Sequence, residues 1–266
     1  MPGCIPLGPD GFRVAKVNKE EIMGGKTTEE AGRLPWPKLL KGTLVKRYRR
    51  FLADVRLNNG HVVTAHCPNS GSMAECSEPG RPVYLSRHNA PERRTRYTWE
   101  MIDMPSSLVG VNTIVPNRLA LASVAAGRVP ELIGYDRIRA EVKYGRNSRI
   151  DLLLEKDASR CFVEVKNCTL VTNGVACFPD AVTSRGLKHL MELQRQVRSG
   201  DRGVMFFLVQ RMDARIFRPA DHIDSAYGEE LRKAVRNGVE VLVYDVTLDL
   251  RGIALRAALP FELAFT

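Results

Sequence analysis

Residues 149–170 read RIDLLLEKDASRCFVEVKNCTL, two apolar runs that are joined by the polar segment EKDASR. Two such runs with a short polar connection predict a β-hairpin. Three charged residues, Asp151, Glu164 and Lys166, interrupt the apolar pattern. A hairpin that only filled a core would not need these charges, so they mark a candidate functional site.

The position of the turn decides which of the charged residues face one another. If the turn is centred between Asp157 and Ala158, antiparallel pairing places Asp151 opposite Glu164. Lys166 follows Glu164 by two residues and therefore points to the same face of the strand. Opposed carboxylates repel each other unless a cation lies between them. The hairpin thus predicts a metal site in which Asp151 and Glu164 bind a hard divalent cation, Mg²⁺ or Mn²⁺.

A lysine beside such a cation suggests phosphodiester chemistry. Lys166 would orient an attacking water or stabilise the charge that develops on a phosphate. Glu141, ten residues before Asp151, would add a metal ligand or act as a general base. The alternative is a solvent-exposed strand face with an Asp–Lys or Glu–Lys cross-strand pair, because the pattern D…ExK is short and also arises by chance.

Upstream of the hairpin, residues 39–113 show short strand patterns with no clear helix between them. The run 43–57 is long and partly β-branched, and Asn58-Asn59-Gly60 separates it from a second run that starts at His61. Asn-Gly between two such runs predicts a hairpin. Four or five strands in about eighty residues predict a small β-barrel, which we assign to residues 34–115.

From residue 116 onward, strand patterns alternate with amphipathic helical patterns. The helical patterns cover residues 117–127, 183–200 and 225–238, with Asn117, Thr183 or Ser184, and Ser225 as their N-caps. This alternation predicts a mixed sheet that is covered by helices over residues 116–266. Residues 1–33 are rich in Gly, Lys and Glu without a sustained period, which predicts a poorly ordered extension.

The composition favours a polyanionic partner, because the formal net charge is +10 at pH 7. The sequence has no apolar run of transmembrane length and no secretory signal, so we expect a cytoplasmic protein with no membrane partner. The six cysteines form no CxxC pair, which is typical of reduced thiols. His66, Cys67 and Cys76 match no known zinc spacing.

Several longer segments resemble the bacterial sugar fermentation stimulation protein A family. The segments are GTLVKRYRRFLADV, HCPNSGSM, YTWEM, EVKYGRNSRIDLLL, CFVEVKNCTL, FPDAVTSRGLKHLMEL and FFLVQRMD. The resemblance runs from about residue 34 to the end of the chain. It implies an OB-like barrel followed by a domain with the PD-(D/E)xK nuclease fold. It also implies DNA binding linked to the regulation of sugar metabolism, especially of maltose.

The resemblance also assigns residues to the site. Asp151, Glu164 and Lys166 match the nuclease-like D…ExK pattern, and Gln210 falls where related nucleases place a polar residue. Many family members carry a glutamate where this chain has Ala122; Glu141 would then have to replace that ligand. The segments 46–51 and 87–99 combine Arg and Lys with aromatic residues, as single-strand-binding OB-folds do. The predicted nucleic-acid contacts are Lys46, Arg47, Tyr48, Arg49, Arg50, Arg93, Arg94, Arg96 and Arg185.

Three functions remain open at this point. The first is a metal-dependent DNA endonuclease that uses Asp151, Glu164, Lys166 and Glu141. The second is a DNA-binding transcriptional regulator that keeps the nuclease fold without catalysis. The third is a regulator that senses a small molecule. DNA is the expected partner in the first two, and further copies of the same chain are an additional expected partner.

Overall fold

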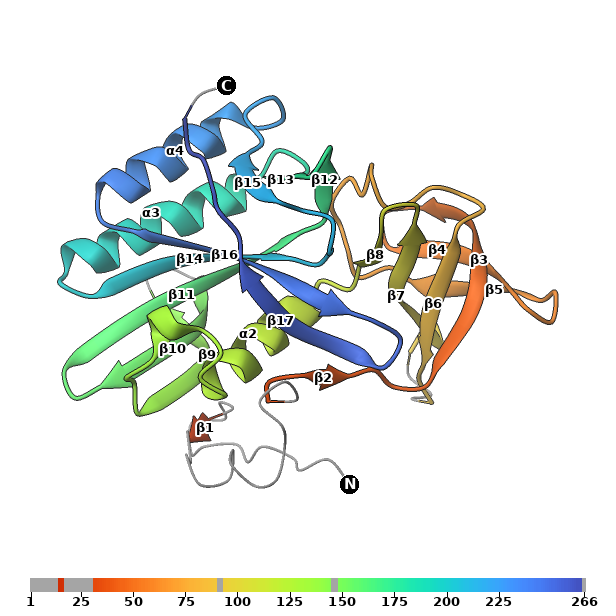
Figure 1. The fold of residues 1–266 in the computed structure, drawn as a ribbon, viewed down its shortest axis with the longest axis horizontal. Coiled ribbons are helices and arrows are strands. Elements are labelled where there is room, and N and C mark those ends of the chain that lie inside the picture. The colour runs from red at the N-terminus through yellow and green to blue at the C-terminus, as the bar shows by residue number, and fades with distance from the viewer. Residues whose placement is uncertain (1–13, 17–30, 90–92, 145–147, 265–266) are drawn as a thin grey trace.

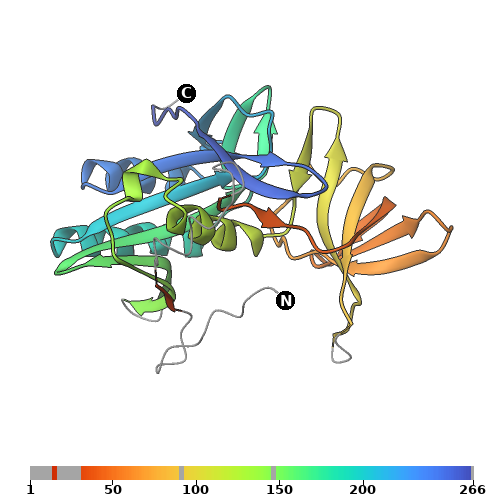
Figure 2. The same cartoon turned by 60° about the horizontal axis from the view of Figure 1, so that its bottom comes forward.

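The computed structural model describes residues 14–16, 31–89, 93–144 and 148–264. Two domains lie side by side, with the N-terminal barrel on the right in Figure 1 and the larger α/β domain on the left. Figure 2 shows the same separation from a second direction. The predicted fold class, an OB-type barrel followed by a mixed-sheet α/β domain, is confirmed. No helix in these described ranges is long and apolar enough to cross a membrane.

The barrel is a sheet in the order β5-β4-β3-β6-β7-β8, whose neighbouring strands are antiparallel and which closes through a parallel pairing of β5 with β7. Its strands are β3 (Leu39–Tyr48), β4 (Leu52–Leu57), β5 (Val62–His66), β6 (Pro82–Arg87), β7 (Tyr97–Met104) and β8 (Ser107–Gly110). Trp99 and Leu85 are among the residues that fill its interior. The hairpin predicted around Asn58-Asn59-Gly60 is present as β4 and β5, and only Gly60 in it has a positive φ.

One strand prediction in the barrel is wrong. The run 43–57 is not a single strand, because it turns back on itself after Tyr48 and forms β3 and β4. The turn is made by Arg49 and Arg50, whose φ values of 51° and 62° are left-handed. Such values are uncommon for residues with a Cβ atom, and so the basic pair gave no turn signal.

The α/β domain is built on an eight-stranded sheet in the order β1-β9-β10-β11-β14-β16-β17-β2. The strands are β1 (Val14–Lys16), β9 (Arg137–Tyr144), β10 (Ser148–Lys156), β11 (Ser159–Cys168), β14 (Arg202–Val209), β16 (Glu240–Leu248), β17 (Gly252–Ala258) and β2 (Leu34–Pro35). The three central strands β11, β14 and β16 are parallel. A second, three-stranded sheet comprises β12 (Leu170–Thr172), β13 (Val175–Phe178) and β15 (Ile216–Pro219).

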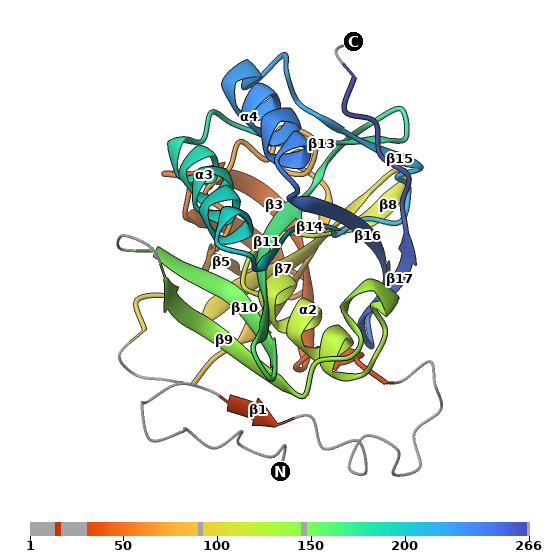
Figure 3. The same cartoon turned by 90° about the vertical axis from the view of Figure 1, so that its left-hand side faces the viewer.

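Helices cover both faces of the eight-stranded sheet (Figure 3). Helix α2 (Val115–Ala125) packs on one face, and α3 (Ser184–Arg198) and α4 (Ser225–Arg236) pack on the other. A single 3₁₀ turn, η1 (Pro130–Leu132), follows α2. The central strand β11 therefore has apolar partners on both sides, as expected for a parallel strand in a covered sheet.

Two predicted helix caps are wrong. Helix α2 begins at Val115, so Asn117 lies inside the first turn, where its side chain is free to bond elsewhere. Helix α4 is capped by Asp224, whose carboxylate accepts from the Tyr227 amide, and Ser225 is its first helical residue. At α3 the predicted cap Thr183 is confirmed, since its hydroxyl accepts from the Gly186 amide.

The extension predicted for residues 1–33 lies mostly outside the described residues. The described parts show Val14–Lys16 paired with β9 and Arg33 paired with Asp249. Outside that extension, the described cysteines Cys67, Cys76, Cys161, Cys168 and Cys177 are all free thiols.

Candidate active site at the domain junction

The central hairpin has the predicted register. Leu152 pairs with Val163 and Lys156 with Ser159, so the two-residue turn is formed by Asp157 and Ala158. Continued by one residue, this register brings Asp151 opposite Glu164. The backbone ladder stops at this point, and the Asp151 carboxylate takes over by accepting a hydrogen bond of 2.8 Å from the Val165 amide.

Asp151 lies in an environment that disfavours its charge. Its second carboxylate oxygen accepts a hydrogen bond of 2.6 Å from the Asn117 side chain on α2. Burial raises the pKa of Asp151 to about 7, and the negative charges of Glu164 and Glu141 add to this effect. Glu141 is thus close enough to act on Asp151, and it lies on β9 with an unusual φ of 56°.

Glu164 is almost completely buried, with 2% of its surface exposed. Its Oε1 atom accepts from Lys166 Nζ at 2.7 Å and also bonds to His189 Nδ1. Burial would raise the pKa of Glu164, but the His189 hydrogen bond and the Lys166 charge outweigh burial and lower it. Oε2 has no hydrogen-bond partner among the described residues, so half of this carboxylate is left unsatisfied.

His189 connects Glu164 to the surface of the site. Arg185 Nε lies 3.4 Å from His189 Nε2 and can only donate to it. Nε2 is therefore the acceptor, and the other ring nitrogen, Nδ1, carries the proton that bonds Glu164. Arg185, His189 and Glu164 thereby form one hydrogen-bonded chain from α3 to β11.

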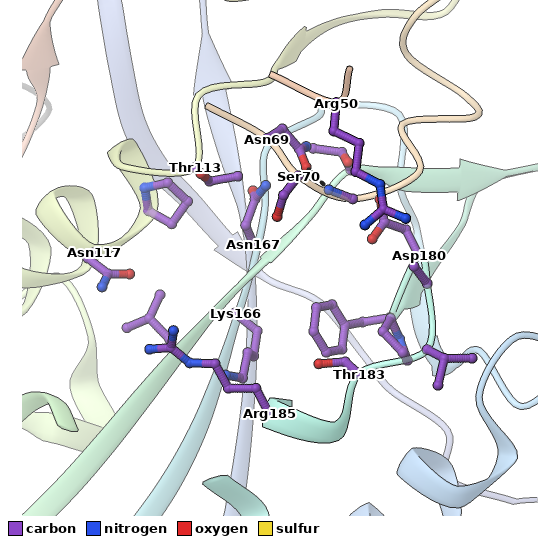
Figure 4. A pocket seen from close by; sticks show the side chains of 18 residues that line it. Arg50, Asn69, Ser70, Thr113, Asn117, Lys166, Asn167, Asp180, Thr183 and Arg185 are labelled. Atoms are coloured by element: carbon purple, nitrogen blue, oxygen red, sulfur yellow. Dashed lines mark hydrogen bonds between the residues drawn. The ribbon is translucent and has the colours of Figure 1, made fainter. Parts of the chain in front are cut away.

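These residues line or support a cleft of about 480 Å³ at the junction of the two domains. Figure 4 shows side chains from both domains around it. Its polar lining comprises Arg50, Asn69, Ser70, Thr113, Asn117, Lys166, Asn167, Thr169, Asp180, Thr183 and Arg185. Asp151 and Glu164 lie behind this lining. Asp151 accepts a hydrogen bond from the lining residue Asn117, and Glu164 accepts one from the lining residue Lys166.

The barrel contributes one wall of the cleft through the loop at residues 69–73. Asp180 of the α/β domain accepts a hydrogen bond of 3.3 Å from the Met73 amide. A side chain at position 71 would collide with the Asp180 carboxylate, which explains the glycine there. Thr113 donates to the Pro68 carbonyl at 3.0 Å. The Met73–Asp180 bond therefore crosses the domain boundary, and the Thr113–Pro68 bond fixes the start of the same loop from within the barrel domain.

The structure does not bring the predicted nucleic-acid residues together at one place. Arg50 and Arg185 line the junction cleft, whereas Arg49, Arg94 and Arg96 line a second groove on the barrel. Lys46 lies over the Tyr48 ring, as their shared strand face predicted, and both interact with Asp54. Arg93 is exposed on the same side as His66, whose pKa is lowered by burial and by the Arg93 charge.

The Arg47 side chain is bonded within the protein and does not project freely toward a ligand. Its guanidinium donates to the carbonyls of Asn69, Gly71 and Ser72 at 2.9–3.0 Å and to that of Arg50 at 3.1 Å. Three of these bonds fix the loop that forms the cleft wall, and the fourth fixes the turn that carries Arg50. The geometry therefore assigns Arg47 to shaping the cleft.

Three neighbours of the charged hairpin were not predicted to belong to the site. Asn117 was predicted to be a helix cap, and neither His189 nor Asn167 was assigned a role. Asn117, which lies five residues before Ala122 on α2, is the residue that bonds Asp151 from this helix. Only the spacing of Arg185 and His189, one helical turn apart, could have indicated a shared site.

Gln210 lies beside the cleft without lining it. It is completely buried, and its amide donates to Asn167 Oδ1 at 2.8 Å and to the Asn112 carbonyl at 3.3 Å. Asn167 does line the cleft. Gln210 thus holds the cleft-lining residue Asn167 and the backbone of Asn112, which follows the last barrel strand, in fixed positions.

The donor set fits a hydrated divalent cation. No cluster of three or more His, Cys, Asp or Glu side chains arranged for a metal occurs in the described ranges. Mg²⁺ nevertheless needs only one or two carboxylates, because it keeps several of its waters. The orphaned Oε2 of Glu164 and the raised pKa of Asp151 both indicate negative charge that lacks full compensation. A cation bound between the two carboxylates would give Glu164 Oε2 a partner and would favour the charged form of Asp151.

Comparison with known proteins gives a consistent result over both domains. A family described as "Sugar fermentation stimulation protein RE domain" matches residues 114–252, and one described as "SfsA N-terminal OB domain" matches residues 45–111. A "Sugar fermentation stimulation protein homolog" of Geobacter sulfurreducens is 57% identical and covers 85% of this chain and 97% of its own. Its counterpart from Nitrosococcus oceani is 52% identical, with coverage of 85% and 97%.

A solved structure is also similar along almost its whole length. It is described as "The structure of Pyrococcus Furiosus SfsA in complex with Ca2+". It is 26% identical to this chain, with a TM-score of 0.80, and the match covers 86% of this chain and 98% of the other.

Proposed function

The chain belongs to the sugar fermentation stimulation protein family, and from this premise we propose that it is a DNA-binding protein that hydrolyses phosphodiester bonds at the junction cleft. The observation that carries the proposal is the convergence of Arg50, Lys166 and Arg185 on one cleft with a buried carboxylate pair directly behind it. Cations alone would suit any anion, but the carboxylate pair adds the groups that phosphodiester hydrolysis needs.

The positive groups bind and orient the phosphate. Arg50 reaches the cleft from the barrel and Arg185 from the first turn of α3. The N-terminus of α3 also opens on this cleft at Thr183, and its dipole favours negative charge there. A phosphate between these groups would contact both domains, which explains why the cleft lies at their junction.

Lys166 is the residue placed to act on the reacting phosphate. Its ammonium lines the cleft and is held at 2.7 Å by Glu164. A charge fixed in this way stabilises the negative charge that develops on the phosphate oxygens in the transition state. His189 keeps the Glu164 carboxylate oriented and anchors Arg185, so these residues act together as one support.

Asp151 and Glu164 are the residues that would hold a divalent cation, with Glu141 close by. A bound Mg²⁺ or Mn²⁺ supplies Lewis-acid activation of water and of the phosphate. The related protein from Pyrococcus furiosus was solved in complex with Ca²⁺, a cation that also prefers oxygen ligands. This similarity supports a divalent-cation site in the present chain.

A plasmid-nicking assay with added Mg²⁺ or Mn²⁺ tests the proposal. Wild-type protein is expected to nick DNA only with the metal, and Lys166→Met and Glu164→Gln are expected to abolish nicking. The matched control is Lys156→Met, at the exposed turn end of the same hairpin. Equal nicking by wild type and Lys166→Met would show that the activity belongs to a contaminant.

A second candidate function is a DNA-binding regulator of sugar metabolism that does not cleave. The observation in its favour is that three of the four carboxylate oxygens already have protein partners, namely Asn117, the Val165 amide, Lys166 and His189. Under this alternative, wild type and Glu164→Gln bind DNA in a gel-shift assay, and neither cleaves it with any divalent cation.

A further inference from the structure

A second groove lies on the barrel, separate from the junction cleft. Its volume is about 750 Å³. Three arginines line it, Arg49, Arg94 and Arg96, together with the aromatic residues Phe51 and Tyr97. No acidic residue is among its described lining residues. The groove therefore combines positive charge with apolar ring surfaces.

The rings in this groove are accessible. Phe51 is 50% exposed, although it is one of the largest apolar residues of the chain. Tyr97 is half-buried at the start of β7, and Leu52 and Val63 provide an apolar floor. An exposed phenylalanine among arginines is poorly suited to a purely solvated surface. It is well suited to a ligand that carries flat rings and negative charge.

The turn between β3 and β4 joins the groove to the junction cleft. Arg49 and Arg50 are consecutive, and both have left-handed φ values. Arg49 lines the groove, whereas Arg50 lines the cleft. Adjacent residues of one tight turn thus present a guanidinium group to each of the two sites. Residues with a Cβ atom rarely adopt this conformation. Here two consecutive arginines adopt it, and the resulting turn directs them to different sites.

We propose that a single strand of nucleic acid binds across both sites, with its bases stacked on Phe51 and Tyr97 and its backbone passing the Arg49–Arg50 turn into the junction cleft. The inference rests on the proposed function, because it assumes that the cleft binds nucleic acid, and it adds the strand specificity. Only an unpaired strand can offer base faces to a protein ring, since a duplex keeps its bases stacked on one another.

Binding measurements without cleavage test this inference. Fluorescein-labelled oligo(dT) of about 16 nucleotides, a length that spans an OB-fold site, is titrated with the full protein in EDTA. The same strand annealed to oligo(dA) and an oligo(rU) of equal length serve as comparisons. We expect oligo(dT) to bind more tightly than the duplex, and oligo(rU) tests whether the sugar matters.

Variants locate the bases in the groove. Phe51→Ala is expected to weaken oligo(dT) binding roughly 5- to 150-fold, the range for loss of one base–ring stack, and to leave duplex binding unchanged. Phe51→Leu keeps an apolar side chain without a ring and should show nearly the same loss. The matched control is Phe261→Ala, a partly exposed ring that lines neither site.

The outcomes separate this inference from the proposed function. Equal affinity for single strand and duplex, or equal effects of Phe51→Ala and Phe261→Ala, would overturn the single-strand inference while DNA cleavage could still be observed. Metal-dependent cleavage without any loss in Phe51→Ala would likewise leave the proposed function standing and reject the groove. Absence of binding to every nucleic acid would reject both.

Discussion

Asn117 donates a hydrogen bond of 2.6 Å to Asp151, which ties helix α2 to the point where the central hairpin loses its backbone ladder. Without this amide, one oxygen of a largely buried carboxylate would have no protein partner. Asn117→Ala is therefore expected to lower the free energy of unfolding by about 1–3 kcal/mol. Chemical denaturation measures this value, and Arg118→Ala, an exposed change on the same helix, should have almost no effect.

The raised pKa of Asp151 predicts a pH dependence of stability in the metal-free protein. A carboxyl whose folded-state pKa is about 7 stays protonated in the folded protein while it ionises in the unfolded chain from about pH 4. The folded state therefore binds more protons between these values, so its stability falls as the pH rises through this window. In wild type this loss in the free energy of unfolding should be on the order of a few kcal/mol, and Asp151→Asn should remove it.

Denaturation of wild type and Asp151→Asn in EDTA at a series of pH values measures this difference. Asp136→Asn, which changes an exposed carboxylate, controls for the change in net charge. If wild type and Asp151→Asn lose stability in parallel between pH 4 and 7, Asp151 is ionised in the folded protein and the assigned environment is wrong.

Divalent cations should counteract the repulsion between the carboxylates of Asp151 and Glu164. A cation that binds only the folded state raises the melting temperature with its concentration by mass action. We expect Mn²⁺ to raise the melting temperature of wild type and to leave Asp151→Asn unchanged. A cross-strand ion-pair face predicts no response of wild type to millimolar Mn²⁺, and that result would contradict the metal assignment.

Much of the fold could be predicted because its signals are local. The turn at Asp157 and Ala158 fixed the register of the hairpin, and period-3.6 apolar patterns located α3 and α4. The turn at Arg49 and Arg50 was missed, because neither residue type favours a left-handed φ. The Arg47 guanidinium supports the turn by bonding both the Arg50 carbonyl and the loop at residues 69–72.

The candidate site could be predicted only where its residues lie on one hairpin. Asp151, Glu164 and Lys166 follow from strand alternation and pairing. Asn117 and His189 reach them from helices on opposite faces of the sheet, and no sequence period connects those positions to the hairpin. The barrel wall with Arg50 depends on how two domains dock, which is a property of their surfaces.

Arg47 and Arg49 are expected to behave differently although they are two residues apart. Arg47→Ala removes a guanidinium that bonds four carbonyls and should lower the free energy of unfolding by about 2–3 kcal/mol. Arg49→Ala should leave stability unchanged, because Arg49 is exposed, and should weaken DNA binding. Thermal melts and binding assays on both variants separate the two effects.

DNA binding should also be strongly salt-dependent. Affinity is expected to fall log-linearly with salt concentration, and removal of one phosphate contact should reduce the slope by about one. Arg49→Ala should show this reduction, whereas Arg198→Ala, an exposed change at the far end of α3, should not. A flat salt response of wild type would exclude a largely electrostatic interface.

Gly110 and Gln210 provide the sharpest test of the junction between the domains. Gly110 ends β8 of the barrel, and its amide donates to the Gln210 carbonyl at 2.9 Å. A Cβ atom at Gly110 would lie 2.6 Å from Gln210 Oε1, in a position that is completely buried. Gly110→Ala must therefore displace the Gln210 side chain, which should lower the free energy of unfolding by about 1–3 kcal/mol.

The displacement should also reach the cleft, because Gln210 holds Asn167 at 2.8 Å and Asn167 lines it. Gln210→Ala removes the obstructing atoms and makes room for the new methyl group. The double variant should thus lose less stability than the sum of the two single losses, by more than the roughly 0.5 kcal/mol within which independent sites add. Urea denaturation of wild type, the two single variants and the double variant gives this coupling free energy. Simple additivity would mean that the two residues do not press on each other and that the junction is looser than the structure shows.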